Sequence, residues 1–228
     1  MKDGKKNGAG VTLNSGHAAA ASPSPPPSLP PTLPPSPAPA PVADLAEACV
    51  RFVERAVGVK LDYQPETLPL LDHYIEGARS LVKEKPEMLP IVAQSSGAYF
   101  GEVVRRRHAS WWRTDGEDPS EWQVELEPVF LAFSPVRLIL AALLRDAYGY
   151  DALPEGDEAD LAQLTLQEDD RIAVVERLAE LPAVSEQEFY ALSTRLEVID
   201  IAVEAIRARH LAEGEETEAR FSPEDYDE

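Results

Sequence analysis

The fold is set by residues 95–112, SSGAYFGEVVRRRHASWW, which lie within and just after a predicted helix over 90–107. Gly97 and Gly101 are one helical turn apart and share a face of that helix. Glycine weakens a helix interior, so its presence here predicts that another element packs closely against this face. We expect that element to be the sheet that carries Trp122.

Three segments after this helix are predicted to be strands: 109–113, 121–127 and 129–133. Apolar and polar side chains alternate along 121–127, which predicts an antiparallel strand with one buried face and with Glu125 on the opposite, polar face. The third segment is more uniformly apolar, which indicates a strand buried on both faces.

Helical periodicity lies on both sides of these strands. Predicted helices cover about 44–57 and 67–85, and a Ser-Pro pair at 134–135 begins an apolar helix that runs to about residue 148. Together the patterns predict an α+β fold. Its helices pack on one face of a small antiparallel sheet of about three strands, and a C-terminal helical pair follows.

Composition divides the 228 residues into four parts. Eleven of the 21 prolines fall between residues 23 and 41, so we expect 1–41 to be a disordered arm, either a docking ligand for an aromatic groove or a semi-rigid spacer. We assign 42–150 to the α+β domain and 151–212 to a helical extension that packs on it. Residues 213–228 hold eight acidic residues and one arginine, which predicts a disordered acidic tail.

The formal net charge of −20 argues against general binding to nucleic acids or anionic membranes, because phosphate contacts need a basic surface. Cys49 is the single cysteine, so a disulfide within the chain and a cysteine-based zinc site are excluded. The histidines form no His-x-x-x-His pair, and we predict no metal and no cofactor. Apolar stretches fall short of the about 20 residues that span a bilayer, which predicts a cytoplasmic protein.

Arg105, Arg106 and Arg107 form a cationic cluster at the end of the predicted helix. The helix macrodipole explains one or two of these cations. The alternative is an anion or carboxylate site, filled by an acidic segment of a partner or by the chain's own acidic tail. Glu102 either pairs with the arginines or, if it is buried beside a tryptophan, is a candidate acid or base.

Trp111 and Trp112 are adjacent on a predicted strand, so their side chains must lie on opposite faces of the sheet. One is expected in the core, and the other is a candidate contact anchor for a partner. The predicted partner- or anion-binding residues are therefore Tyr99, Glu102, Arg105, Arg106, Arg107, Trp111 and Trp112. No residue is assigned a catalytic role.

A capping-box pattern at 185–188 predicts the start of a long final helix that ends near residue 212. Its apolar residues recur in steps of three and four, as in a coiled-coil seam: Phe189, Leu192, Leu196, Ile199, Val203 and Ile206. Two interpretations are open. The seam either forms a homodimer or packs on the chain's own domain.

One segment resembles a known group of proteins. Residues 97–102, Gly-Ala-Tyr-Phe-Gly-Glu, the Trp-x-Val-x-Leu pattern at 122–126 and the Phe-Ser-Pro start of the next helix are similar to a group of uncharacterised bacterial proteins. These proteins carry a small α+β domain of unknown function, in which a Gly-x-Tyr-hydrophobic-Gly-Glu helix precedes a tryptophan-containing hairpin. The resemblance covers about 60–148. It implies a fold class and no activity.

Motifs for familiar chemistry are missing from the sequence: it has no Gly-x-Ser-x-Gly elbow and no glycine-rich phosphate loop. The leading prediction is a non-enzymatic cytoplasmic adaptor or regulatory protein that acts through protein–protein interaction. The alternative is a small-molecule or anion sensor that uses the Arg105–Arg107 cluster. A second alternative is an enzyme with Glu102 as its acid or base.

Overall fold

A computed structural model describes residues 37–145, 161, 163–214 and 221–227. Most of the predicted proline-rich arm lies outside the described residues, as do residues 146–160 and part of the predicted acidic tail. The first described residues lead directly into the first helix.

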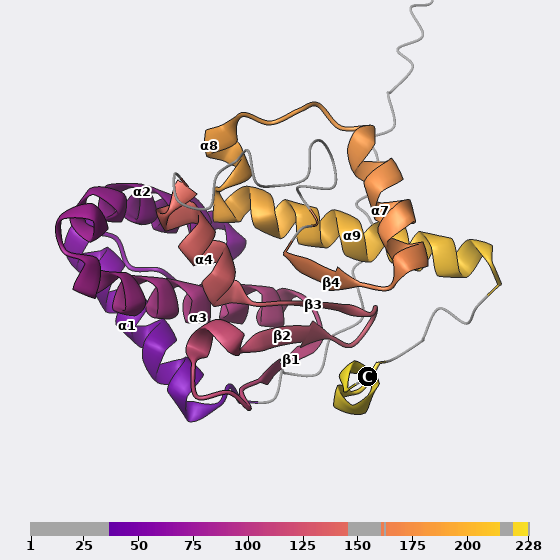
Figure 1. The fold of residues 1–228 in the computed structure, drawn as a ribbon, viewed down its shortest axis with the longest axis horizontal. Helices are drawn as coiled ribbons and strands as arrows, with labels where there is room; N and C mark the ends of the chain where they lie inside the picture. Colours follow the sequence, from indigo (N-terminus) through magenta and orange to yellow (C-terminus); the bar gives the residue numbers. More distant parts are fainter. Residues whose placement is uncertain (1–36, 146–160, 162, 215–220, 228) are drawn as a thin grey trace, which may run out of the picture. The chain divides into compact units, whose positions relative to one another are not determined.

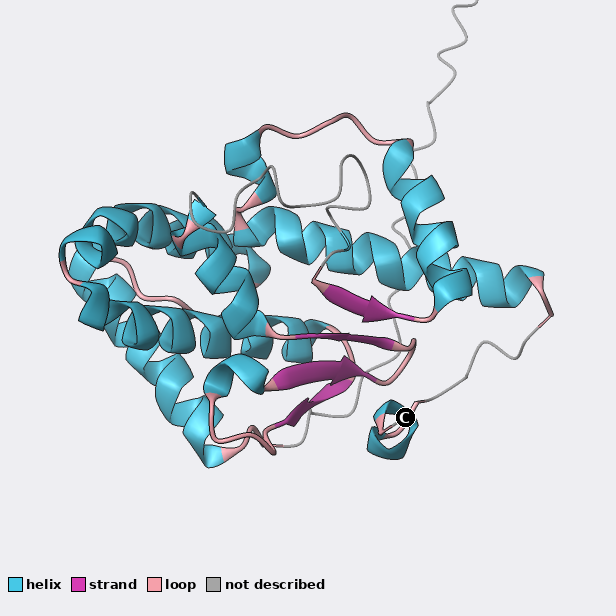
Figure 2. Cartoon of the chain, in the orientation of Figure 1, coloured by secondary structure: helices cyan, strands magenta, loops and turns pink. Residues whose placement is uncertain are grey.

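The described part of the chain contains α-helices, a sheet and a few short 3-10 turns (Figures 1 and 2). The helices are α1 (Ala40–Val57), α2 (Leu68–Glu84), α3 (Leu89–Arg107), α4 (Pro135–Leu143), α7 (Glu168–Ala179), α8 (Glu186–Phe189) and α9 (Leu192–Ala212). The strands are β1 (Ser110–Arg113), β2 (Gln123–Leu126), β3 (Leu131–Phe133) and β4 (Leu164–Leu166). The α+β class predicted from the sequence is confirmed.

The sheet has four strands in the order β1-β2-β3-β4, and every neighbouring pair is antiparallel. The sequence predicted about three strands. The fourth, β4, lies in the segment 151–212 that was assigned to a helical extension. Because β4 pairs with β3, that segment completes the sheet, and the predicted boundary at residue 150 does not separate two units among the described residues.

Local sequence signals set several helix ends correctly. Gly58 ends α1 with a φ of 81°, a left-handed conformation that glycine adopts without strain. Ser134 caps α4 by accepting a hydrogen bond from the Arg137 backbone N–H. Ser185 and Glu188 form the predicted capping box, but it caps only the short α8. A separate helix, α9, begins at Leu192, so the long helix predicted over 185–212 is interrupted.

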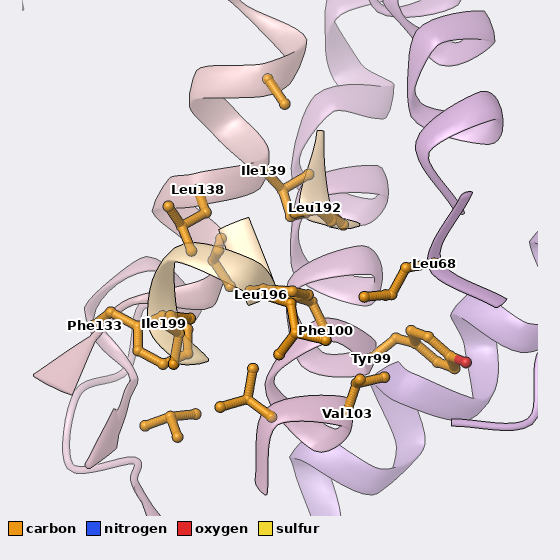
Figure 3. Close-up of a cluster of buried hydrophobic side chains, with 14 of the residues drawn as sticks. Leu68, Tyr99, Phe100, Val103, Phe133, Leu138, Ile139, Leu192, Leu196 and Ile199 are labelled. Atoms are coloured by element: carbon orange, nitrogen blue, oxygen red, sulfur yellow. The ribbon is translucent and has the colours of Figure 1, made fainter. Parts of the chain in front are cut away.

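The inner face of the sheet carries one residue from each strand at matching register, namely Trp112, Val124, Phe133 and Leu164. All four are buried. Phe133 meets Phe100 of α3 edge to face at a centroid distance of 6.2 Å. Figure 3 shows Phe133 and Phe100 with Ile199 of α9 in the same apolar cluster, so the helices and the inner face share one core.

The heptad-like residues of the last helical region are all buried in the single chain. They are Phe189, Leu192, Leu196, Ile199, Val203 and Ile206. This face packs against α7 and α2 and contributes to the common core. Packing within the chain, the second of the two interpretations left open by the sequence, accounts for the seam pattern, and the homodimer stays a prediction.

Within the described ranges, none of the helices combines the length and the apolar character needed to cross a membrane.

Candidate functional site

The glycine face of α3 is filled by close packing. A methyl group at Gly97 would lie 2.8 Å from the Val136 backbone, and one at Gly101 would overlap the ring of Trp112. Gly101 also faces Pro135. The predicted close approach to the sheet is therefore found at Gly101, which meets Trp112 of β1, and both glycines also meet the start of α4. β1 reaches this face because it follows α3 directly and folds back onto it.

Glu102 lies in the core next to these glycines, with only 3% of its surface exposed. Arg105 holds its carboxylate in a bidentate pair, with Nε 2.7 Å from Oε1 and an Nη atom 2.8 Å from Oε2. The Trp112 indole N–H donates a third hydrogen bond to Oε1 at 2.8 Å. The sequence treated pairing and burial of Glu102 as alternatives, and both occur.

This arrangement fixes the charge state of Glu102. Burial opposes ionisation, but the hydrogen bonds from Arg105 and Trp112 outweigh it and lower the pKa of Glu102 below its ordinary value. A general acid or base that works near neutral pH needs a pKa close to that range. The geometry around Glu102 is therefore that of a structural carboxylate, which orients Trp112 under Gly101.

The rest of the arginine cluster is also engaged within the chain. Arg106 lies over the ring of Tyr63 at 3.9 Å, and Tyr63 stacks on Tyr99 at 4.7 Å. Arg107 pairs with Asp200 of α9 at 2.7 Å. Arg106 and Arg107 are exposed at their outer sides, whereas Arg105 is buried.

Tyr99 is wholly buried, and its hydroxyl acts as a structural hydrogen-bonding group. The backbone N–H of Tyr63 donates to it at 2.8 Å, and the hydroxyl of Thr67 lies 3.2 Å away. Tyr99 thus ties the turn before α2 to α3. This role leaves no part of Tyr99 at a surface where a ligand could meet it.

Trp111 and Trp112 lie on opposite faces of β1, as predicted. Trp112 enters the core, and Trp111 lies half-buried on the outer face, the sheet surface away from the helices that cover the inner face. Trp111 donates its indole N–H to Glu125 of β2, and Arg113 lies 2.6 Å from the same carboxylate. Trp111 is the one predicted anchor that reaches a surface site.

Glu125 corrects the prediction for β2. The alternation placed it on the face opposite the core, and it does lie there beside Trp111, but only 1% of it is exposed. Burial raises the pKa of Glu125, although Trp111 and Arg113 act in the opposite direction. Periodicity could not reveal this burial because the outer face is covered by residues distant in the sequence.

The covering segment comes from the C-terminus and comprises residues 221–227, which we call the strap. It forms the 3-10 turn η5 (Pro223–Tyr226), located in Figure 1 near the mark for the chain end, beside the turn between β2 and β3. The prediction of a disordered tail over 213–228 is therefore wrong for these residues. Acidity alone suggested disorder, but two aromatic residues give the strap apolar area to bury.

Tyr226 anchors the strap. Its ring stacks on Phe130 at a centroid distance of 4.4 Å and an interplanar angle of 9°, and it meets Trp111 edge to face at 5.9 Å. Phe221 contacts Phe130 edge to face at 5.7 Å. The rings of Trp111 and Phe130 therefore receive both aromatic residues of the strap.

Polar contacts complete the surface under the strap. Arg113 donates to the Pro223 carbonyl at 2.9 Å and pairs with Asp227 at 2.8 Å. The Phe221 backbone N–H donates to the Glu127 carbonyl, also at 2.8 Å. We call the surface formed by Trp111, Arg113, Glu125, Phe130 and the backbone from Leu126 to Leu131 the strap site.

The structure thus separates the residues that the sequence grouped as one site. Tyr99, Glu102, Arg105 and Trp112 are interior, Arg106 and Arg107 bind groups of the same chain, and Trp111 belongs to the strap site. Arg113, Phe130 and Tyr226 were not among the predicted site residues. Two features of the sequence could have pointed to them. The acidic tail contains aromatic residues, and the tail was already a candidate to fill an arginine site. The arginine that it meets is Arg113.

Among the described residues, histidine, cysteine and carboxylate side chains form no group of three or more that could hold a metal ion. Comparison with family models, with curated proteins and with solved structures gives no match. The resemblance of residues 60–148 to uncharacterised bacterial α+β proteins therefore stays a prediction.

Proposed function

We propose that this chain is a cytoplasmic adaptor or regulatory protein that acts by binding another protein, with the strap site as its recognition surface. The observation that carries the proposal is the strap itself, a short segment held by aromatic stacking, backbone hydrogen bonds and an arginine–carboxylate pair. These are the contacts by which domains recognise linear segments of partner proteins.

The composition of the strap site supports the same function. Tryptophan, tyrosine and arginine are the residues that dominate binding energy at protein interfaces, because they combine large apolar area with specific polar groups. Trp111 and Arg113 are two residues apart on β1, so both side chains lie on the same face of the sheet. A strand holds them at fixed spacing, which favours recognition of a defined sequence.

The two alternatives from the sequence have less support. An anion sensor would need guanidinium groups that are available to a ligand, but Arg105 is paired with Glu102 and Arg107 with Asp200. An enzyme that uses Glu102 would need an accessible group with a pKa near neutrality, but Glu102 is buried and its pKa is lowered.

A peptide-display selection on the immobilised full chain tests the proposal. Tyr226→Ala removes the anchor of the strap while leaving the strap site intact, so this variant should enrich peptides from a random library. The double variant Trp111→Ala, Tyr226→Ala also loses the strap but damages the site, and it should not retain them. If the two variants enrich the same peptides, or neither enriches any, the strap site is not a recognition surface.

A further inference from the structure

Resting on the function proposed above, the further inference concerns what binds the strap site and what limits access to it. The strap is not a uniform acidic tail. It reads Phe-Ser-Pro-Glu-Asp-Tyr-Asp over residues 221–227, and the structure gives each of its recognition features a separate role. Those roles define the chemistry of a ligand.

The first feature is a phenol rather than a plain aromatic ring. The Leu131 backbone N–H donates to the Tyr226 hydroxyl oxygen at 3.0 Å, and that oxygen lies 2.7 Å from the carbonyl oxygen of Leu126 and 3.0 Å from that of Val129. The hydroxyl thus satisfies backbone groups in the turn between β2 and β3. Burial raises the pKa of Tyr226, which keeps the hydroxyl protonated as a donor.

The second feature is a carboxylate directly after the phenol. Asp227 reaches Arg113, whose guanidinium also contacts the Pro223 carbonyl and Glu125. Because Glu125 is buried beneath this arginine, Arg113 is held in place before a ligand arrives. A fixed guanidinium recognises carboxylate geometry with less loss of entropy than a mobile one.

The third feature is a turn that the segment forms by itself. The Asp225 carboxylate accepts hydrogen bonds from the backbone N–H and the hydroxyl of Ser222, at 2.7 and 2.8 Å. These contacts lie wholly within the strap, and they bring Phe221 and Tyr226 to one side, where their rings are 6.4 Å apart. A short linear segment of another protein can carry all of this information.

The fourth consideration is the tether. The strap belongs to the same chain as its site, and a tethered ligand acts at an effective concentration in about the millimolar range. A partner segment with the same contacts would therefore meet an occupied site. Its apparent affinity equals its intrinsic affinity multiplied by the fraction of molecules in which the strap is released.

We propose that the strap site binds an acidic, tyrosine-containing segment of a partner protein, with an aromatic residue five positions before the tyrosine and a carboxylate after it, and that residues 221–227 are the built-in competitor of that segment. The strap thereby occupies the strap site until a partner segment is present at high local concentration.

Fluorescence anisotropy with a labelled peptide of residues 221–227 tests both parts. The peptide is titrated with the full chain as wild type, as Tyr226→Ala and as Leu211→Ala, an exposed control on α9. We expect Tyr226→Ala to bind the peptide at least about tenfold more tightly than wild type, and Leu211→Ala to match wild type. A peptide carrying Tyr226→Phe should bind the opened chain at least about fivefold more weakly, because it lacks the hydroxyl.

Two results would overturn the inference. Equal binding by wild type and Tyr226→Ala would mean that the strap does not compete. No binding by Tyr226→Ala, when display on the same variant still recovers Trp111-dependent peptides, would mean that the site prefers another chemistry while the proposed function stands. Should Tyr226→Ala fail to fold, Asp227→Lys replaces it. That carboxylate is mostly exposed, and its reversal weakens the pair with Arg113.

Discussion

Glu102 stays ionised in the interior because three hydrogen bonds surround its carboxylate, two from Arg105 and one from Trp112. A buried charge is tolerated only when partners of this quality replace water. Glu102 also ties α3 to β1, because it lies in α3 with Arg105 and accepts a hydrogen bond from Trp112 of β1. A residue that the sequence singled out as a candidate acid or base is thus part of the framework.

Replacing Glu102 tests that role. Glu102→Gln keeps the size of the side chain but removes the negative charge beside Arg105, and we expect the free energy of unfolding to fall by about 3–5 kcal/mol at neutral pH. Urea denaturation followed by circular dichroism measures the change. Glu47→Gln, which removes an exposed pair with Arg51, is the control and should cost at most about 1 kcal/mol.

The same variant has a defined pH dependence. Because the pKa of Glu102 is lowered in the folded state, its stabilisation is present above the ordinary pKa of a glutamate and is lost as the pH falls through the lowered value. Glu102→Gln should therefore be less sensitive to acid than wild type at that end of the range. An unchanged slope of stability against pH would contradict the ionised state of the buried carboxylate.

Two glycines in different helices give a matched prediction. Gly101→Ala would drive a methyl group into the Trp112 ring and to within 3.0 Å of Pro135, so we expect a loss of about 1–3 kcal/mol. Gly77→Ala adds a methyl group on the exposed side of α2, where nothing lies within 4 Å, and should stabilise the fold by about 0.5–1 kcal/mol. Opposite shifts in thermal midpoint would confirm the pair, whereas shifts of the same sign would contradict it.

At the scale of elements, the last helical region shows how a correct pattern can suggest two different packings. A three-and-four repeat describes any helix with a narrow apolar stripe. In this chain the stripe packs on α7 and α2, and Asp72 of α2 receives the backbone N–H groups of Leu192 and Ser193 at the start of α9. Asp72 thus caps the N-terminus of α9 from another helix, which explains why α9 starts as a separate helix after α8.

Ile199 distinguishes the core from a dimer seam. Ile199→Ala should lower the free energy of unfolding by about 2–5 kcal/mol, because the side chain is buried among residues of its own chain. Leu211→Ala, on the same helix but 61% exposed, should change stability by no more than about 0.5 kcal/mol. A variant that instead kept its stability but halved in mass by light scattering would assign the stripe to a dimer.

Local sequence patterns do not predict β4 or the buried face of α7. Leu164–Leu166 is too short for an alternation to be recognised beside the acidic residues before it. In α7 the buried residues are Asp170, Val174 and Leu178, whereas the apolar Ile172 is 53% exposed. Asp170 is buried because Arg209 and His210 of α9 meet its carboxylate, a partnership that no local pattern predicts.

At the scale of the whole molecule, the end of α3 is joined to α9 by one carboxylate. Asp200 accepts a hydrogen bond from Arg107 at 2.7 Å and lies the same distance from the His108 ring. Burial opposes the ionised form, but these two contacts lower the pKa of Asp200. The arginine cluster that looked like a surface for partners therefore also holds the last long helix against the sheet-bearing part of the chain.

Asp200→Asn tests this link. We expect a loss of about 1–2 kcal/mol in unfolding free energy at neutral pH, smaller than for Glu102→Gln because Arg107 is partly exposed. The loss should shrink as the pH falls through the lowered pKa of Asp200, where wild type also loses the charge. Glu197→Gln, at an exposed position on α9, is the control. Equal effects of the two variants would mean that the link contributes nothing specific.

The sequence by itself determined the α+β class, most helices, the first three strands and the glycine face of α3, because these follow from short-range periodicity, caps and backbone freedom. It also predicted that Trp111 and Trp112 lie on opposite faces of the sheet, but the structure was needed to show that Trp111 is the one on the outer face. Only the tertiary structure decided that Glu102 is a buried ion pair, that α9 packs inward and that the strap covers Glu125. Each of these depends on contacts between residues far apart in the chain, whose burial and electrostatics no local pattern encodes.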